Sequence, residues 1–484
     1  MVADKDFGEP LFIKGKTYGY DHYNIALTLN GTGKYLKQIT IGDYRLNIGE
    51  GLAMKQNFSF GYFSPTFGAK QSAKEIVPMR SSTEYNYNKG IAAKFNAGKV
   101  DILAFASYTP IDYNGKTVQQ TGYHRTQTEI DHKYATAVAM GGSSMQYWNK
   151  GFNLGITFFA YHYKDSVYRG QSEYQKYLFE GKDNNVVAVN TSYERKNMIV
   201  FGEIARSMNN AYSFLLGQQY SLGYRSGFSI VLRKYSPDYQ NAYANAIGVQ
   251  SCNRNETGVY ADYSYYVSRK LQFSAGFDMF YFPKESYRAK EKALGEKFRA
   301  VLSYQIHEKH LLDFNLRLQN RQYNDNTKDS VTELSNNIII QPQLKYKFSY
   351  SERLAFVYRI GYSHTFIGDA DNDYGFYNYV EMILRAKKLP LDFNLRWTYF
   401  RTTSYDNRFY VYEYSLPMSY SSAMLYNTGN KLYVMLGGSL SKNWKIYLRY
   451  NLTRYNNTKE ISSGNTKITG NLQHYAGGQI FYKF

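Results

Sequence analysis

Four residues that could bind a metal ion lie close together in the sequence: His124, Glu129, Asp131 and His132. Imidazole and carboxylate groups of this kind bind Zn²⁺ and related ions. Their spacing matches no common zinc pattern, however, and a hydrogen-bonded loop is the favoured interpretation. The sequence therefore predicts no resident metal here.

A short acidic stretch near the start of the chain offers oxygen ligands from Asp4, Asp6 and Glu9. Calcium prefers such ligands, but the twelve-residue spacing of an EF-hand is absent. The chain also lacks the G-x-S-x-G and H-E-x-x-H signatures of hydrolases. We expect no cofactor and no enzymatic activity, with a lipid- or polymer-modifying site as the minor alternative.

Basic residues form a further set that could bind a ligand. The chain has 58 Lys and Arg against 39 Asp and Glu, which gives a net charge of +19. Eight of them stand opposite apolar neighbours in alternating segments and are predicted to face a lumen. They are Arg233, Arg317, Lys345, Lys347, Arg359, Arg396, Lys445 and Arg449. We expect many of them to pair with acids such as Asp313 and Asp392 or with carbonyl groups of internal segments. The remainder would favour anionic polymers over cations.

The elements that must position these residues are strands, because apolar and polar residues alternate in many segments. The clearest segments span 312–319, 353–360, 391–399 and 444–453. Segments of roughly 9–11 residues suffice for a tilted strand to cross a bilayer. Further strands are predicted near 20–30, 33–46, 89–96, 98–108, 142–149, 151–163, 185–196, 197–207, 211–221, 226–236, 256–267 and 270–282.

The connections between these strands alternate between short and long. Those near 307–310, 349–353, 387–390 and 441–443 are tight, and those near 283–296, 322–336, 366–373 and 455–468 are long and polar. Outer-membrane barrels place short turns on the periplasmic side and long loops outside. If short and long connections are to alternate as far as the C-terminus, residues 405–441 must contain three strands. We expect them near 407–414, 417–424 and 430–440.

The composition excludes the other way of crossing a membrane, since the chain has no run of 18 apolar residues. It has 53 Tyr, 30 Phe and 3 Trp, as aromatic girdles at membrane interfaces require. A lipid-exposed sheet must close on itself to satisfy its edges. The sequence predicts a single all-β domain over residues 1–484, a transmembrane antiparallel β-barrel of about 20–26 strands.

Two segments, 47–88 and 110–141, break the alternation and are predicted to fold into the lumen as a partial plug. Long extracellular loops are the alternative interpretation.

The final strand alternates and carries Tyr482 and the terminal Phe484, which we interpret as the signal for barrel assembly.

Seven short strings, taken together, resemble one protein family. They are ADKDFGEP (3–10), GDYRLNIGEGLAM (42–54), RSSTEYNYNKGIA (80–92), TGYHRTQTE (121–129), FGEIA (201–205), NETGVY (255–260) and the Phe-ended last strand. In this order they resemble the C-terminal barrel of the helix-hairpin-helix outer-membrane proteins of Bacteroidota. The family-motif and plug residues implied by the resemblance are Asp6, Glu9, Asp43, Tyr44, Gly49, Glu50, Gly51, Glu84, His124, Arg125, Glu203 and Glu256.

The sequence departs from that family in its N-terminal part and at Glu50, where Gln is usual. A signal peptide and a helix-hairpin-helix region are not seen before the first strand, so we expect a barrel cut from a longer precursor. Helix-hairpin-helix motifs usually bind nucleic acid, and by analogy the family is linked to DNA uptake.

These observations predict a Gram-negative outer-membrane barrel acting as a gated pore or translocation channel, with an anionic polymer such as DNA as candidate cargo. The alternative is a closed barrel that serves as an anchor or a subunit of an envelope assembly. The expected partners are outer-membrane lipid and lipopolysaccharide, the barrel-assembly machinery acting on the C-terminal strand, nucleic acid and other envelope proteins.

Overall fold

The computed structural model describes residues 1–6, 8–13, 17–31, 33–57, 68–70, 74–324, 333–367, 373–386, 391–417, 419, 422–462 and 466–483. The strands of the first half are β1 Val2–Asp4, β2 Phe12–Ile13, β3 Thr17–Tyr18, β4 His22–Asn24, β5 Ala26–Asn30, β6 Leu36–Ile48, β7 Met54–Lys55, β8 Ile76–Pro78, β9 Asn88–Ala97, β10 Val100–Ile111, β11 Thr136–Asn149, β12 Phe152–Val167, β13 Gly181–Arg195, β14 Met198–Ser207, β15 Tyr212–Leu222 and β16 Ser226–Tyr235.

The strands of the second half are β17 Glu256–Tyr266, β18 Leu271–Phe282, β19 Ala293–His307, β20 His310–Asn324, β21 Leu334–Ser349, β22 Leu354–Ile367, β23 Asp373–Arg385, β24 Leu391–Thr402, β25 Phe409–Tyr412, β26 Ser422–Leu425, β27 Thr428–Ser439, β28 Trp444–Tyr455, β29 Glu460–Ile461, β30 Ile468–Thr469 and β31 Leu472–Tyr482. The helical elements are α1 Gln127–His132, η1 Glu173–Gln175 and η2 Ser251–Asn253. No helix among the described residues is long and apolar enough to cross a membrane.

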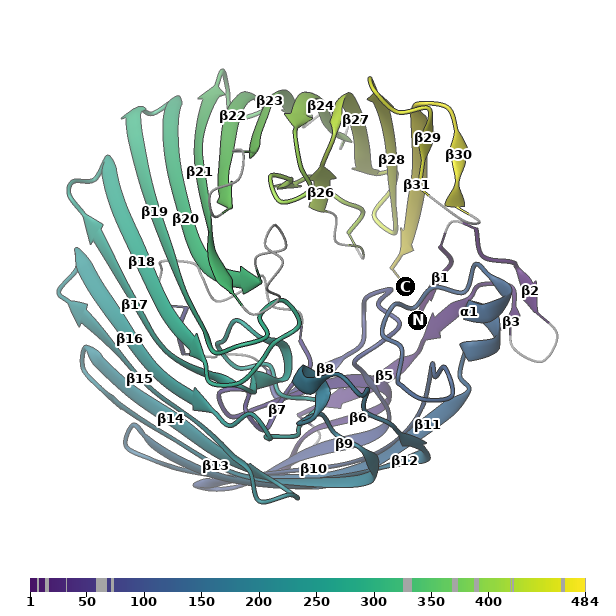
Figure 1. Ribbon diagram of the computed structural model, residues 1–484, viewed down its shortest axis with the longest axis vertical. Helices are drawn as coiled ribbons and strands as arrows, with labels where there is room; N and C mark the ends of the chain where they lie inside the picture. The colour runs from purple at the N-terminus through teal and green to yellow at the C-terminus, as the bar shows by residue number, and fades with distance from the viewer. Residues whose placement is uncertain are drawn as a thin grey trace. The chain divides into compact units, whose positions relative to one another are not determined.

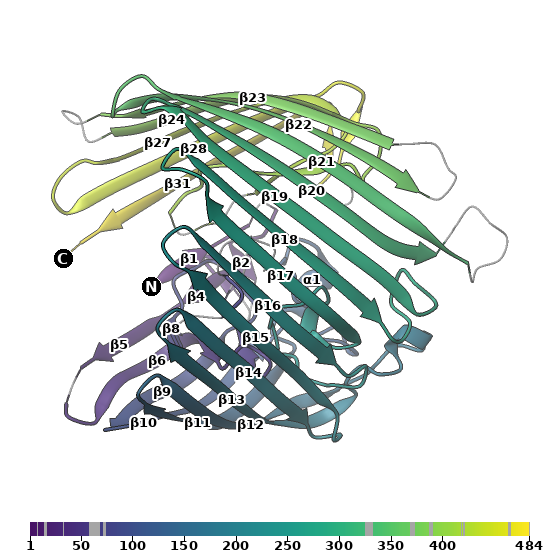
Figure 2. The same cartoon turned by 90° about the vertical axis from the view of Figure 1, so that its left-hand side faces the viewer.

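The fold is an antiparallel β-barrel, as the sequence predicts. Its strand order is β5-β6-β7-β8-β9, then β10 to β24 in sequence, then β27-β28-β31. The described residues contribute 23 strands to this order, within the predicted range, and two of them, the short β7 and β8, belong to the segments inside the wall, where β6 also pairs directly with β9. Figures 1 and 2 show neighbouring strands such as β13 and β14 running side by side.

Two compact units are distinguished along the chain. The first comprises Met1–Tyr263 and Gly276–Gly295, and the second comprises Ser264–Ala275 and Glu296–Phe484. Each contains part of the large sheet together with segments that leave it.

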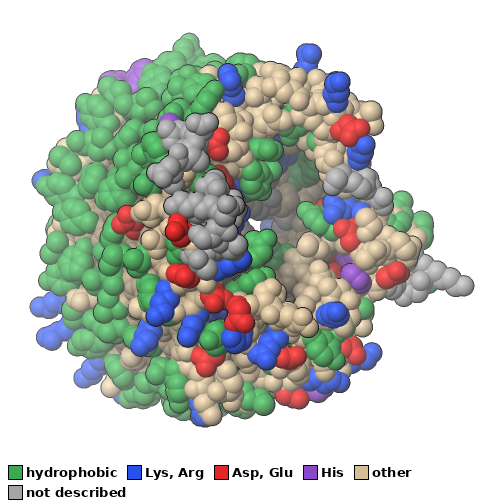
Figure 3. All heavy atoms as spheres, in the orientation of Figure 1, with side chains coloured by type: hydrophobic (Ala, Val, Ile, Leu, Met, Phe, Trp, Pro, Cys, Tyr) green, Lys and Arg blue, Asp and Glu red, His purple; other side chains and the backbone are tan. Residues whose placement is uncertain are grey.

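Alternation explains why the strands of the first unit expose one face and bury the other. In β12, Ile156 and Phe158 lie on the outer face and are about half exposed, whereas Phe159 and Tyr161, at odd-numbered positions on the opposite face, are buried. The buried face packs against internal segments, and residues such as Leu52 belong to the same hydrophobic cluster as Phe159. In Figure 1, β7 and β8 lie on the concave side of this part of the sheet. A space-filling view shows hydrophobic side chains gathered along the outer flank on the left (Figure 3).

In the second unit, the three strands predicted within 405–441 are found as β25, β26 and β27, but only β27 belongs to the wall, so the expected alternation of the connections is wrong here. β24 pairs directly with β27 in the large sheet. β25 and β26 instead form a separate two-stranded sheet, in which Phe409 pairs with Leu425. Phe409 and Leu425 are buried in one cluster with Tyr377 and Phe400 of the wall. The alternation near 407–414 therefore reflects packing of a hairpin against the wall, and Figure 1 shows β26 inside β24 and β27.

The boundaries of the predicted plug segments need correction. Residues 110–111 end β10 and residues 136–141 begin β11, so only 112–135 stand outside the wall in that region. Within 47–88, β7 and β8 pair with β6, and residues 58–67 and 71–73 lie outside the described residues. The described remainder packs against other parts of the first unit.

The short connections between wall strands are confirmed at Glu308–Lys309, between β19 and β20, and at 440–443, between β27 and β28. The connection predicted at 387–390 lies outside the described residues, as does Phe484. The final strand, β31, is confirmed and pairs with β28, where Tyr482 stands opposite Trp444. Their ring centroids lie 4.8 Å apart.

Candidate functional site

The internal segment 47–57 is fastened to the wall by Glu203, which lies on β14. One carboxylate oxygen of Glu203 accepts hydrogen bonds from the backbone nitrogens of Glu50 and Leu52, at 2.7 and 3.0 Å. The other accepts one from the nitrogen of Ala53 at 2.8 Å. Glu203 is 3% exposed, so three backbone donors replace the water that its charge would otherwise need.

Glycine makes this approach of the segment to the wall sterically feasible. Gly49 has φ +65°, and a Cβ atom built there would lie 2.7 Å from a Glu203 carboxylate oxygen. The other side of the segment is held by residues 236–255, since the hydroxyl of Tyr239 and the amide of Asn241 both donate to the carbonyl of Leu52 at 2.8 Å. Segment 47–57 is thus hydrogen-bonded on one side to the wall and on the other to a second internal segment, residues 236–255.

A buried ion-pair cluster fastens that second segment in turn. The Arg233 guanidinium on β16 donates to Glu256 on β17 at 2.6 Å and to Asp278 on β18 at 2.7 Å. Glu256 also accepts from the backbone nitrogens of Val249 and Gln250, at 2.8 and 3.0 Å. Arg233 and both acids are fully or almost fully buried. The cluster therefore joins three neighbouring strands to the segment 236–255.

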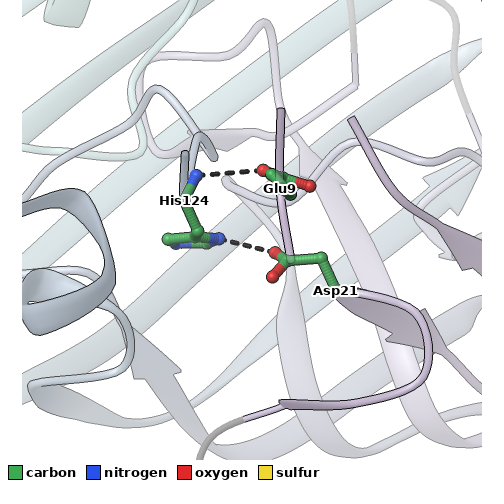
Figure 4. A group of neighbouring side chains, drawn as sticks. All are labelled: Glu9, Asp21 and His124. Atoms are coloured by element: carbon green, nitrogen blue, oxygen red, sulfur yellow. Dashed lines mark hydrogen bonds and ion pairs between the residues drawn. The ribbon is translucent and has the colours of Figure 1, made fainter. Parts of the chain in front are cut away.

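A third cluster forms around His124, which lies between β10 and α1 (Figure 4). Its Nδ1 lies 2.6 Å from an Asp21 carboxylate oxygen, and its Nε2 lies 2.9 Å from Asp112. Its backbone nitrogen donates to Glu9 at 2.9 Å. The Lys133 ammonium donates to Asp21 at 2.6 Å. The cluster connects the N-terminal residues with the loop 112–135.

The protonation of this cluster follows from its contacts. Burial disfavours the charged imidazolium, but the hydrogen bonds to Asp112 and Asp21 outweigh burial and raise the pKa of His124 to about 9. Burial and then the charge of Asp21 raise the pKa of Glu84 to about 9. Because both ring nitrogens of His124 are held by carboxylates, the imidazole is poorly placed to act as a general base.

The metal constellation considered from the sequence does not assemble around His124. Glu129 closes a capping box with Thr126 at the start of α1 and pairs with Arg125 at 3.1 Å. Asp131 accepts a hydrogen bond from Gln127. In the acidic stretch, the backbone nitrogen of Asp6 donates to Glu9 at 2.7 Å. The hydrogen-bonded loop favoured by the sequence accounts for these contacts.

The family-motif strings come together in pairs in the structure. The string with Glu9 meets the one with His124, and the string with Gly49, Glu50 and Gly51 meets the one with Glu203. Asp43 accepts from the backbone nitrogen of Ile25 at 2.6 Å and pairs with Lys89 at 3.1 Å.

Three further motif residues hold neighbouring segments together. The hydroxyl of Tyr44 donates to carbonyls of β9 and β10, at 3.1 and 3.2 Å. Glu84 lies beside His124, and Arg125 stacks on Tyr123 at 3.9 Å. Residues that are distant in sequence thus share internal contacts.

Among the eight basic residues, those of the second unit that are buried are paired with acids. Arg396 donates to Glu381 at 3.0 Å, and Arg449 donates to Glu413 at 2.5 Å. Glu413 follows β25, so the pair with Arg449 ties the internal hairpin to β28. The predicted pairing of a basic residue with Asp313 is confirmed at Lys345, at 3.0 Å, and Asp392 lies 3.5 Å from Arg385.

The remaining basic residues are more accessible. Arg317 is exposed and donates to Gln319 at 3.3 Å, and Arg359 is half-buried and donates to Gln343. Lys347 is half-buried and Lys445 is exposed.

A cavity of about 220 Å³ lies in the second unit. It is lined by Arg299, Val301, Ser303, Asp313, Asn315, Gln343, Lys345 and Arg359.

Sequence reasoning missed the acids and the lysine that complete these clusters. Asp21, Asp112, Lys133 and Glu413 carry no local signal that would link them to their partners. Asp278 does have a usable cue, since a charged residue within an alternating strand must face away from lipid.

No model of a known protein family and no curated protein matches the chain. Among solved structures, the siderophore receptor PirA from Acinetobacter baumannii is similar with 9% identity and a TM-score of 0.46, over 95% of this chain and 77% of that one. The outer membrane channel DcaP of the same organism has 9% identity and a TM-score of 0.33, over 70% and 95%. At these values the likenesses carry no functional argument.

The location of the protein follows from the sheet. Large apolar residues such as Phe158, Leu216 and Trp397 lie on wall strands and are about half exposed. Hydrocarbon is the environment that such a face requires, and only a barrel can present strands to it. The protein is an outer-membrane β-barrel.

Proposed function

We propose that this barrel is a gated channel whose internal segments control passage. The observation that carries the proposal is the attachment of segment 47–57 by Glu203, through three hydrogen bonds to backbone nitrogens. These bonds can break without disturbing the strand ladder of β14. The segment is also held by the pairing of β7 with β6 and by Tyr239 and Asn241, so loss of the Glu203 bonds loosens one of its attachments to the wall. Segments 236–255 and 403–417 have comparable side-chain attachments and form further candidate gates.

Anionic solutes are the cargo class that we propose. Arg299, Lys345 and Arg359 line the cavity of about 220 Å³ in the second unit together with a single acid, Asp313. Such a surface favours anions. The pairing of Arg233, Arg396 and Arg449 with buried acids reduces the number of basic residues that cargo could contact.

DNA is one anionic polymer that this proposal admits, and salt dependence tests it. Binding of DNA should weaken by roughly 0.9 log units per neutralised phosphate for each log unit of salt. Absent or salt-insensitive binding would remove DNA from the proposal. The resemblance to helix-hairpin-helix outer-membrane proteins of Bacteroidota stays a prediction, as do binding of lipopolysaccharide and recognition of Tyr482 and Phe484 by the assembly machinery.

A closed barrel that serves as an anchor or envelope subunit is the second candidate function. It is favoured by the buried cluster of Arg233, Glu256 and Asp278, because ion pairs of this kind are costly to open. Planar-bilayer recordings separate the two functions. A channel should open in wild-type protein or after weakening of the Glu203 attachment, whereas an anchor should stay closed in both.

A further inference from the structure

Glu84 is a buried acid whose charge has no hydrogen-bonding partner among the described residues. Its side chain is 7% exposed, and neither carboxylate oxygen accepts a hydrogen bond within the described part of the chain. One of these oxygens lies 3.8 Å from Nδ1 of His124, so the carboxylate points at the His124 cluster. A buried carboxylate without a partner is costly, and the cost is relieved either by a proton or by a cation bound beside it.

Three residues beside Glu84 bring potential metal ligands close together. One ligand atom each from Glu9, Asp21 and His124 lies within 4.8 Å of the others. All three residues are buried, with exposures of 4%, 4% and 1%. Figure 4 shows Glu9 and Asp21 on the same side of His124.

The charges of the cluster leave a place for additional positive charge. Four carboxylates, those of Glu9, Asp21, Glu84 and Asp112, gather around His124. Lys133 and a protonated His124 balance two of them, and Glu84 is neutral at neutral pH because its pKa is raised to about 9. One carboxylate of the buried cluster therefore stays uncompensated, and ionisation of Glu84 would add a second, which is costly for groups buried together.

A cavity adjoins this position. This cavity, of about 60 Å³, borders Glu84 and Asp112 and is lined further by Tyr87, Thr109 and Tyr134. Its lining combines polar groups with apolar side chains such as Ile111 and Val138, and its volume is large enough for water.

We propose that Glu9, Asp21, Glu84 and His124 bind one divalent first-row metal ion of the Mn²⁺ to Zn²⁺ range. Carboxylates combined with an imidazole favour these ions over Ca²⁺, which prefers oxygen alone. The ion takes the place of the Nδ1 proton of His124 and of the Glu84 carboxyl proton, and both protons pass to solvent. Asp112 keeps its hydrogen bond to Nε2 and orients the ring, as carboxylates commonly do for metal-bound histidines. This site is independent of the proposed channel function.

Metal content of the full chain in detergent tests the proposal. The protein is treated with chelator, dialysed separately against Zn²⁺, Mn²⁺ and Ca²⁺, and measured by mass spectrometry of the bound metal. We expect a single equivalent of Zn²⁺ or Mn²⁺ in the wild type. Glu84→Gln, which keeps the size of the side chain, should weaken binding by more than about 10-fold, and Asp112→Asn by about 10–100-fold.

Glu129→Gln is the matched control, because Glu129 lies in the same loop region but caps α1 instead of facing His124. Gln preserves that cap, so binding should match the wild type. Folding of every variant is checked by circular dichroism and heat-dependent gel mobility. Unchanged binding in folded Glu84→Gln, or binding of Ca²⁺ without either transition metal, would overturn the proposal. So would a wild type that retains no metal.

Discussion

The Glu203 carboxylate lies 2.7 Å from the backbone nitrogen of Glu50, although the two residues are 153 positions apart in the sequence. This contact joins a wall strand to an internal segment through a side chain instead of a strand ladder. Backbone donors converging on a buried carboxylate bind it strongly while the cluster excludes water. The same contact is therefore the place where a small chemical change should free the segment.

Glu203→Gln should loosen segment 47–57 without unfolding the wall. Glutamine loses the charge and one of the two acceptor oxygens, so some of the three backbone donors lose their partner at a cost of roughly 3 kcal/mol. We expect faster cleavage of this segment by an added protease and unchanged β-sheet content by circular dichroism. Glu173→Gln, an exposed acid outside the wall strands, is the control and should leave cleavage unchanged. Equal protection of Glu203→Gln and wild type would show that the attachment is unimportant.

Gly49→Ala should destabilise the barrel more than Gly98→Ala. The two glycines have similar φ angles, +65° and +68°, so both substitutions incur the left-handed strain of about 1 kcal/mol. Only at Gly49 would the new Cβ meet Glu203, whereas nothing lies within 4 Å at Gly98. Overpacking should add roughly 1–3 kcal/mol at Gly49. Denaturant unfolding followed by tryptophan fluorescence measures the difference, and equal losses would contradict the packing described here.

Arg233→Met should be strongly destabilising, because it leaves the buried acids Glu256 and Asp278 without their cation. Breaking a buried ion pair by removing one partner costs about 3–5 kcal/mol. The comparison is Arg317→Met, at an exposed arginine whose substitution should change stability by less than about 0.5 kcal/mol. Heat-dependent gel mobility reports the loss of the folded barrel. A stable Arg233→Met protein would mean that the cluster does not hold the three strands together.

Cys252 should react slowly with thiol reagents in the intact protein. It is the one cysteine of the chain and lies in segment 236–255, where burial raises the pKa of its thiol. Since the thiolate is the reactive form and burial keeps its fraction small, alkylation should stay slower than that of a free thiol throughout the range from pH 7 to pH 9. Glu256→Gln, which weakens the hold on Val249 and Gln250, should accelerate labelling severalfold. Rapid labelling of the wild type would show that the segment is open.

The wall strands could be predicted from the sequence because a bilayer imposes a strict alternation on them. Leu391 to Tyr399 and Trp444 to Thr453 show this alternation, and both lie in wall strands, β24 and β28. Alternation also occurs at Phe409 and Val411, where the apolar side is buried against the wall instead of facing lipid. A period of two indicates a strand but does not identify its partner, so the hairpin of β25 and β26 was assigned wrongly to the wall.

The internal contacts were largely beyond prediction, for a different physical reason. Glu203 and Glu50 could be singled out by the family resemblance, but nothing in either string shows that a carboxylate meets a backbone nitrogen. Asp21 and Lys133 are 112 positions apart, and their ion pair depends on how two loops fold together. Such pairs are set by tertiary packing, which local spacing does not encode.

Single-channel recording of wild-type protein and Glu203→Gln in planar bilayers tests the central claim most directly. If segment 47–57 is a gate held by Glu203, the variant should show larger or more frequent openings than wild type, and its current should favour anions. If both proteins are inserted and folded yet carry no current, or if their currents are identical, the gated channel is contradicted.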